Sequence, residues 1–114
     1  MLPFSVDVLE YLDHHGHSPY AEWFNALNPQ AAAKVVTAVL RISSGNLSNV
    51  KGVGSGVFEY RIDFGPGYRV YFGRDGERII ILLGGGSKKR QQRDIQDAIA
   101  RWQDYKIRKK KGAK

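Results

Sequence analysis

Four basic side chains gather where a strand-like pattern gives way to a helical one: Lys88, Lys89, Arg90 and Arg93. They fall in the first turns of an expected helix, where the helix dipole is already positive and each exposed cation costs about 0.3–1 kcal/mol. Residues that are locally unfavourable for the structure are found most often at functional sites. Because a helix N-terminus with added cations can hold an anion, the pattern predicts an anion site here.

Further polar side chains project from one face of two expected strands, where Arg61 precedes a glycine turn and Arg69 and Tyr71 follow it. The planar fork of an arginine matches two phosphate oxygens, so Arg69 is a candidate phosphate ligand. Two structural alternatives stay open. Arg69 could instead form an ion pair with Asp63, and Arg61 could stack on Tyr71.

Three histidines, His14, His15 and His17, are close enough in the chain to suggest a transition-metal site. They lie beside Gly16 without a nearby set of carboxylates or cysteines, so a surface turn is the preferred interpretation. The sequence contains no cysteine, which excludes disulfides and thiolate metal sites. We expect neither a metal nor another cofactor.

Charge is distributed unevenly along the chain, whose net charge is +7. Residues 1–50 hold two basic and four acidic side chains, a balance of −2. Residues 51–114 hold sixteen basic and seven acidic ones, a balance of +9. This asymmetry favours a polyanionic partner such as nucleic acid, although a solvated basic surface would look the same.

Period-two alternation predicts strands over residues 57–64 and 68–72, and an unbroken apolar run predicts a central strand over 79–83. A three-residue Gly65-Pro66-Gly67 loop and an Asp75-Gly76 turn would join them. The resulting meander would have one apolar and one polar face. Its expected pairs are Phe64 with Tyr68, Asp63 with Arg69, Arg61 with Tyr71, Phe72 with Ile79, and Arg69 with Leu82.

Helix starts are marked by Ser18-Pro19 and Asn28-Pro29, each a capping residue followed by proline. A third helix follows Ser87, and residues 4–12 are a weaker strand. Residues 43–56 are expected as a glycine-rich loop that carries Lys51 but lacks a phosphate-loop motif. The predicted fold class is therefore α+β, in the order β-α-α-β-β-β-α, with a helical hairpin packed on a mainly antiparallel sheet.

The length of 114 residues predicts one domain, residues 1–105, followed by a basic and flexible tail over 106–114. No apolar run approaches the roughly 18 residues that span a membrane, so no membrane association is expected. The N-terminus lacks the pattern of a signal peptide, and together with the absence of cysteine this indicates a cytoplasmic protein.

Several segments together resemble the RelE/ParE toxin superfamily, in the HigB-related, phage-derived Gp49-like branch of addiction-module killer proteins. The most specific is GPGYRVYF at residues 65–72, accompanied by GVFEYRI at 56–62, GGSK at 85–88 and QQRDI at 91–95. The resemblance extends from the first strand to about Tyr105 and implies a RelE-like fold.

The resemblance implies a type II toxin that is neutralised by a cognate antitoxin, often a small helix-turn-helix protein. Related toxins bind the ribosome and cut mRNA without a metal, through attack of the ribose 2′-OH on the adjacent phosphate. ParE members share the fold but inhibit DNA gyrase without enzymatic activity, which leaves a second function class open.

Metal-free RNA cleavage needs proton transfer and stabilised negative charge, which makes Arg69, Lys88, Arg61 and Tyr71 the candidate catalytic residues. The candidate RNA-binding residues are Lys51, Lys89, Arg90 and Arg93. Arg69 would hold the scissile phosphate, and Lys88 would stabilise charge or donate a proton, unless it is a solvated surface lysine. Tyr71 would stack on a base or transfer a proton, unless it is a partly buried structural residue. Ser87 replaces the acidic residue usual in this turn, and the C-terminal catalytic tyrosine of RelE has no equivalent near Ile95. The general base is not identified.

Overall fold

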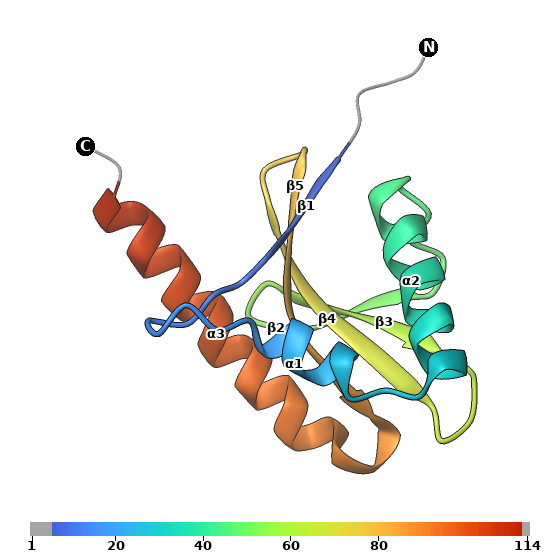
Figure 1. Cartoon of the computed structure of the whole chain (residues 1–114). Coiled ribbons are helices and arrows are strands. Elements are labelled where there is room, and N and C mark those ends of the chain that lie inside the picture. Colours follow the sequence, from blue (N-terminus) through green and yellow to red (C-terminus); the bar gives the residue numbers. More distant parts are fainter. Residues whose placement is uncertain (1–5, 113–114) are drawn as a thin grey trace.

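A single five-stranded sheet with helices on both sides makes up the computed structural model, which describes residues 6–112 (Figure 1). The strand order is β1-β5-β4-β3-β2; only β1 and β5 are parallel, and the other pairs are antiparallel. The elements in chain order are β1 (Asp7–Glu10), α1 (Pro19–Asn25), α2 (Pro29–Ser43), β2 (Val50–Gly54), β3 (Val57–Ile62), β4 (Tyr68–Asp75), β5 (Ile79–Ser87), the 3₁₀ helix η1 (Lys88–Arg90) and α3 (Gln91–Gly112).

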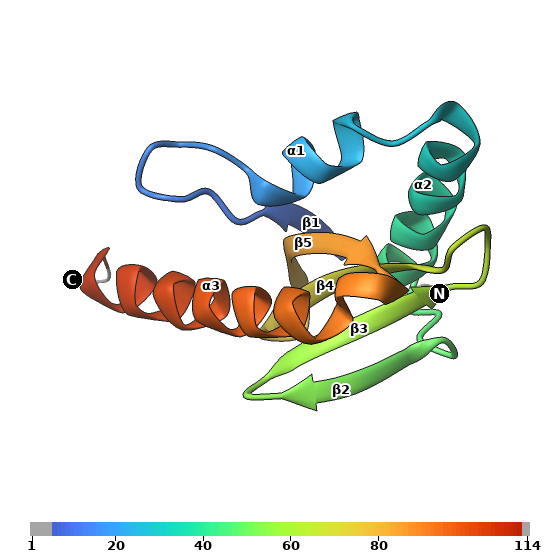
Figure 2. The same ribbon diagram turned by 90° about the horizontal axis from the view of Figure 1, so that it is seen from below.

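Two apolar cores lie on opposite faces of the sheet. The larger core joins α1 and α2 to the even-numbered side chains of β3, β4 and β5, with Val35, Val70 and Phe72 fully buried. The smaller core joins the odd-numbered face to α3 through Ala98 and Trp102. Figure 2 shows α3 along the face opposite to α1 and α2. The predicted α+β class, with a helical hairpin on a mainly antiparallel sheet, is confirmed.

Both predicted helix starts are confirmed by their capping bonds. Ser18 Oγ accepts a hydrogen bond from the Ala21 amide at 3.0 Å, and Asn28 Oδ1 accepts one from the Ala31 amide at 2.8 Å. Each cap satisfies an amide that has no partner within its helix, and the proline that follows each cap is already set for helical φ.

The glycines before the third helix belong to β5 rather than to a turn. Gly84, Gly85 and Gly86 pair with β4, and their lack of a side chain admits bulky neighbours. A Cβ atom at Gly85 would lie 2.2 Å from the Trp23 ring, and one at Gly86 would lie 1.9 Å from Asp94 Oδ2. Helices on both faces can therefore approach the backbone of this strand closely.

The predicted strand register is wrong by two residues between β3 and β4. Ile62 lies opposite Tyr68, and Arg61 lies opposite Arg69. Phe64 leaves the ladder and packs against the larger core, with Gly67 N donating to its carbonyl at 2.9 Å. The connection is therefore longer than the three-residue loop that the sequence predicted.

The predicted register between β4 and β5 is also wrong. Phe72 pairs with Leu82 rather than Ile79, and Arg69 pairs with Gly86 rather than Leu82. Asp75 lies opposite Ile79, so the turn has three residues, and an irregularity between Tyr71 and Phe72 shifts the remaining pairs. An extra residue of this kind is hard to see in a sequence because it interrupts no pattern.

Residues 50–54, expected within a loop, form the edge strand β2. Val50 pairs with Tyr60 and Lys51 with Glu59, and the register shifts between Gly52 and Gly54. The glycines remove the side-chain alternation by which a strand is recognised, but the backbone still pairs with β3.

The chain ends differ from expectation in length. The first strand covers Asp7–Glu10, and residues 4 and 5 of the expected strand lie outside the described residues. The expected basic tail is helical as far as Gly112, since α3 continues through it. Within residues 6–112 there is no helix long and apolar enough to cross a membrane.

Candidate functional site

A hollow of about 490 Å³ opens at the end of the sheet where β3 stops, β4 starts and the chain enters η1. We call it the groove. It collects side chains from β2, β3, β4 and η1, so segments far apart in the sequence meet in it. Its lining residues are Ser48, Asn49, Val50, Lys51, Arg61, Ile62, Asp63, Gly67, Tyr68, Arg69 and Lys88.

Four of the basic residues singled out in the sequence line this groove: Lys51, Arg61, Arg69 and Lys88. Arg61 and Arg69 lie directly opposite each other on adjacent strands. Like charges in that arrangement destabilise a sheet, and an anion between them would relieve the repulsion. Among the described residues that line the groove, Asp63 supplies the only carboxylate.

Gly67 brings Arg69 and Lys88 together. Its φ of +82° lies in the left-handed region that favours glycine, and its carbonyl accepts a hydrogen bond from the Lys88 amide at 3.0 Å. A Cβ atom at Gly67 would lie 3.6 Å from both Arg69 Nη1 and Lys88 Cβ. The glycine-rich turn thus places one edge of the guanidinium and the base of the lysine side chain beside the same point.

Arg69 is held from beneath by a carboxylate. Its Nε lies 3.6 Å from Glu59 Oε2, and both side chains are almost fully buried. Gln91 Nε2, from the first turn of α3, donates to the same Glu59 oxygen at 2.9 Å. The ion pair that the sequence suggested with Asp63 is therefore replaced by one with Glu59, because the register differs and Glu59 is the diagonal neighbour of Arg69.

Tyr71 lies outside the groove. It is 1% exposed in the smaller core beneath α3, and its hydroxyl has no hydrogen-bond partner among the described residues. Burial, and then the nearby Glu59 carboxylate, raises the pKa of Tyr71 far above its usual value. The position fits the structural alternative for this residue and gives it no access to a bound base.

The remaining candidate cations flank the groove. Lys89 and Arg90 lie on η1 and Arg93 on the first turn of α3; all three are exposed and none lines the hollow. Ser87 precedes η1 but makes no capping bond through its side chain. The crowding of positive charge at a helix N-terminus, inferred from the sequence, is therefore present, and one member of that group, Lys88, reaches the groove.

Sequence reasoning missed Glu59, Gln91 and Tyr68 as site residues. Glu59 and Gln91 meet only because α3 packs across β3, which no local pattern reveals. Tyr68 lines the groove although its place in the alternation assigned it to the apolar face. Its position next to the glycine turn was the available signal.

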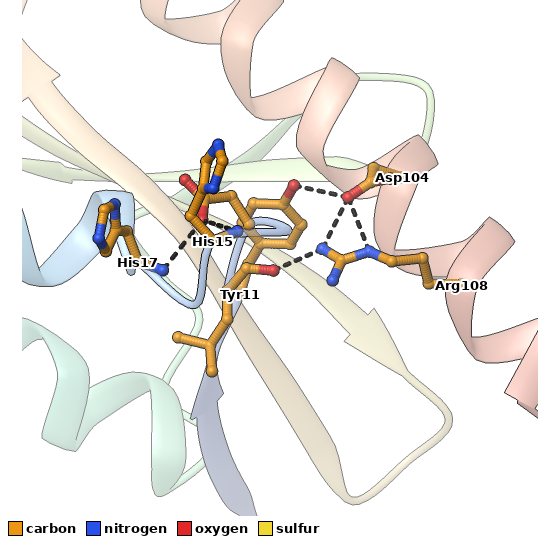
Figure 3. A network of polar contacts seen from close by, with 7 residues as sticks. Tyr11, His15, His17, Asp104 and Arg108 are labelled. Carbon is orange, nitrogen blue, oxygen red and sulfur yellow. Dashed lines mark hydrogen bonds and ion pairs between the residues drawn. The ribbon is translucent and has the colours of Figure 1, made fainter.

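The three histidines lie in an exposed turn, as the sequence favoured. Asp13 Oδ1 accepts hydrogen bonds from the backbone amides of His15 and His17, each at 2.9 Å (Figure 3). Within residues 6–112, no group of three or more histidine, cysteine, aspartate or glutamate side chains could hold a metal ion.

A polar cluster next to this turn fastens the end of the first strand to α3. Tyr11 donates to Asp104 at 2.6 Å, and Arg108 Nε donates to the same carboxylate at 2.9 Å while its Nη2 reaches the Leu12 carbonyl (Figure 3). The hydrogen bond from Tyr11 lowers the pKa of Asp104, with Arg108 adding to the effect. This cluster anchors the later turns of α3.

Two comparisons identify what the chain is similar to. The profile of the family described as Phage derived protein Gp49-like (DUF891) matches residues 22–106. A protein of Haemophilus influenzae (strain ATCC 51907 / DSM 11121 / KW20 / Rd), described as an uncharacterized protein, is 41% identical over 80 residues. That alignment covers 69% of this chain and 81% of the relative.

Proposed function

Because this chain belongs to the phage-derived Gp49-like family, a RelE-type toxin family, we propose that it is a ribosome-dependent mRNA endonuclease within a toxin–antitoxin pair. The observation that carries the proposal is the convergence of Lys51, Arg61, Arg69 and Lys88 on one groove. A groove of that charge suits the phosphates of a single-stranded RNA.

The reaction class that fits is transfer of the scissile phosphate to the neighbouring ribose oxygen. The 2′-oxygen loses its proton and bonds to phosphorus, while the bond from phosphorus to the 5′-oxygen breaks and that oxygen gains a proton. The products are a 2′,3′-cyclic phosphate and a free 5′-hydroxyl. This chemistry requires a proton acceptor, a proton donor and stabilisation of the negative charge on phosphorus.

The groove offers a side chain for each requirement. Arg69 presents Nη1 beside Gly67 and is assigned the charge on the phosphate, with Arg61 opposite it. Lys88 is assigned the leaving oxygen, either as a proton donor or as a compensating charge. Asp63 is assigned the 2′-hydroxyl proton, since it is the carboxylate at the groove.

Glu59 and Gln91 act through Arg69 rather than on RNA. The Glu59 carboxylate faces Nε and leaves the Nη1 edge directed toward Gly67. A guanidinium fixed in this way has already lost its side-chain freedom before substrate binds, which makes transition-state stabilisation more effective. Ribosomal positioning of the mRNA would supply the remaining alignment.

The test is single-turnover cleavage of a defined mRNA on programmed ribosomes. Arg69→Ala should lower the cleavage rate about 10²–10³-fold, the usual loss for one electrostatic contact in a transition state. Arg69→Lys should restore only part of it because a point charge lacks the fork. Lys88→Ala should show a milder loss. Full cleavage by a folded Arg69→Ala protein would remove Arg69 from the site.

Asp63→Ala separates chemistry from structure. Since Asp63 is exposed and Arg69 pairs with Glu59, this variant should melt at the wild-type temperature and yet cleave slowly. A lowered melting temperature of Asp63→Ala would instead support a structural role for Asp63. If the wild-type protein cleaves nothing and instead inhibits supercoiling by gyrase, the protein belongs with the non-enzymatic ParE-like toxins.

A further inference from the structure

A second hollow, of about 310 Å³, lies between the end of β4 and the C-terminal half of α3, away from the groove. We call it the distal hollow. Arg69 of the groove and Arg74 of the distal hollow lie near opposite ends of β4, five residues or about 17 Å apart along that strand. Its lining residues are Arg74, Asp75, Trp102, Tyr105, Lys106, Lys109 and Lys110.

Aromatic rings form the floor of the distal hollow. Trp102 and Tyr105 stack with ring centroids 5.3 Å apart and planes 6° from parallel. Their polar atoms are already engaged or turned away, because the Tyr105 hydroxyl donates to Asp75 at 2.6 Å and the Trp102 nitrogen lies against Gly56. A ligand seated here would find rings and lysine methylenes but few hydrogen-bonding groups.

Cations form the rim. Arg74, Lys106 and Lys110 are exposed, and within residues 6–112 none of them forms an ion pair. Lys106 Nζ lies 5.7 Å from the centroid of the Trp102 ring. Among the described residues that line the hollow, Asp75 is the one carboxylate, and it pairs with Lys109. The rim therefore carries uncompensated positive charge around an apolar floor.

We propose that the distal hollow binds an acidic segment of a partner protein, with an apolar side chain in the hollow and carboxylates against Arg74, Lys106 and Lys110. An apolar anchor in a pocket surrounded by matched charges is the usual form of a peptide hot spot. Nucleobases are the less suitable occupant because their polar edges would find few partners on this floor. Because the hollow is remote from the groove, a bound partner leaves the groove open.

The partner assignment rests on the proposed toxin–antitoxin role, but the site can be tested without ribosomes. The probe is a fluorescein-labelled peptide of sequence EDELLELDE, compared with one in which every leucine is serine, and binding is followed by fluorescence anisotropy. The serine peptide should bind about tenfold more weakly or worse, since the apolar contribution is lost. Equal binding of both peptides would overturn the proposal.

Charge reversal on the rim gives the second readout. The double variant Lys106→Glu/Lys110→Glu should weaken binding of the leucine peptide by about tenfold or more. The control, Arg41→Glu/Lys34→Glu, makes the same change of net charge on α2 and should bind nearly as wild type. An equal loss of peptide affinity in the control would show that the effect comes from overall net charge, and the proposed site would be wrong.

Competition with a single-stranded RNA oligonucleotide tests whether nucleic acid, rather than an acidic peptide, occupies the distal hollow. If the RNA displaces the peptide and loses affinity in the Lys106→Glu/Lys110→Glu variant, the distal hollow is a nucleic-acid site and the proposal is wrong. If the peptide binds but mRNA on programmed ribosomes is not cleaved, the docking site stands and the nuclease assignment fails. The converse result, mRNA cleavage without peptide binding, would support the nuclease proposal and contradict the docking proposal.

Discussion

Glu59 lies beneath Arg69, which lines the groove, and both side chains are almost completely shielded from water. Taking two charges out of water is costly, and their attraction repays that cost only when further hydrogen bonds satisfy them. Here Gln91 bonds one carboxylate oxygen, whereas Glu59 Oε1 has no partner among the described residues. An arrangement so incompletely satisfied is expected where position matters more than stability, which supports Glu59 as the residue that orients Arg69.

Glu59→Gln should lower the free energy of unfolding by about 3–5 kcal/mol, because it leaves the Arg69 charge buried without its counterpart. Urea denaturation measures this loss. The double variant Glu59→Leu/Arg69→Met should recover most of the stability, since replacing a whole buried pair by apolar groups is often neutral. It should nevertheless fail to cleave mRNA. Cleavage by this folded double variant would show that the pair serves packing alone.

The glycine-rich end of β5 shows how a strand can be shaped by its neighbours. Gly85→Ala would place a Cβ atom 2.2 Å from the Trp23 ring, and α1 would have to move. Overpacking of this kind costs about 1–3 kcal/mol. A thermal melt of Gly85→Ala should show this loss. Gly52→Ala in β2 is the matched control: its Cβ would find its nearest neighbour, Phe58, at 4.0 Å, and its melting temperature should hardly change.

Acid should loosen the attachment of α3 to the first strand. The hydrogen bond from Tyr11, aided by Arg108, lowers the pKa of Asp104 from 3.8, so the folded protein holds the charged form more strongly than the unfolded chain does. The stabilisation is present above that ordinary value and is lost as the pH falls through the lowered one. Asp104→Asn should therefore melt below wild type at pH 7, and the gap should narrow towards pH 3. A difference in melting temperature that did not change with pH would exclude the Asp104 charge as its cause.

Local signals predicted the helices well, and nonlocal pairing set the limit for the strands. Ser18 and Asn28 mark helix starts because a cap and its proline act within a few residues. The strand β2 was missed because its glycines hide the alternation, and the register failed because Phe64 is withdrawn into the core beside α2. Such choices depend on contacts between distant segments and leave no periodic trace in the sequence.

The candidate site likewise contains residues that the sequence predicted and residues that only the fold reveals. Residue type and position in the sequence were enough to predict four basic site residues, which the structure gathers in one groove: Lys51, Arg61, Arg69 and Lys88. Tyr71 could not be assigned correctly, because its burial depends on α3 lying across its face of the sheet. The alternation distinguished two faces but did not reveal that both were covered.

At the level of the whole molecule, the toxin assignment makes a prediction about cells. Expression of this chain alone should arrest bacterial growth, and co-expression of the small protein encoded by the neighbouring reading frame should relieve the arrest. Growth curves with verified levels of folded protein measure the effect. The Arg69→Ala variant is the control and should be harmless at equal expression. Normal growth with abundant folded wild type would count heavily against the assignment.

The parallel pairing of β1 with β5 has a kinetic consequence. Asp7, near the start of the chain, finds its partner Ile79 only after three other strands and two helices have been made. Contacts between such distant segments form late and slow folding. Gln91, which braces Glu59 behind the groove, follows later still. A nascent chain therefore lacks a finished sheet, and lacks the Gln91 hydrogen bond to Glu59 that helps to hold Arg69, until β5 and the start of α3 have been synthesised. A partner supplied during that interval would meet the toxin before its groove is complete.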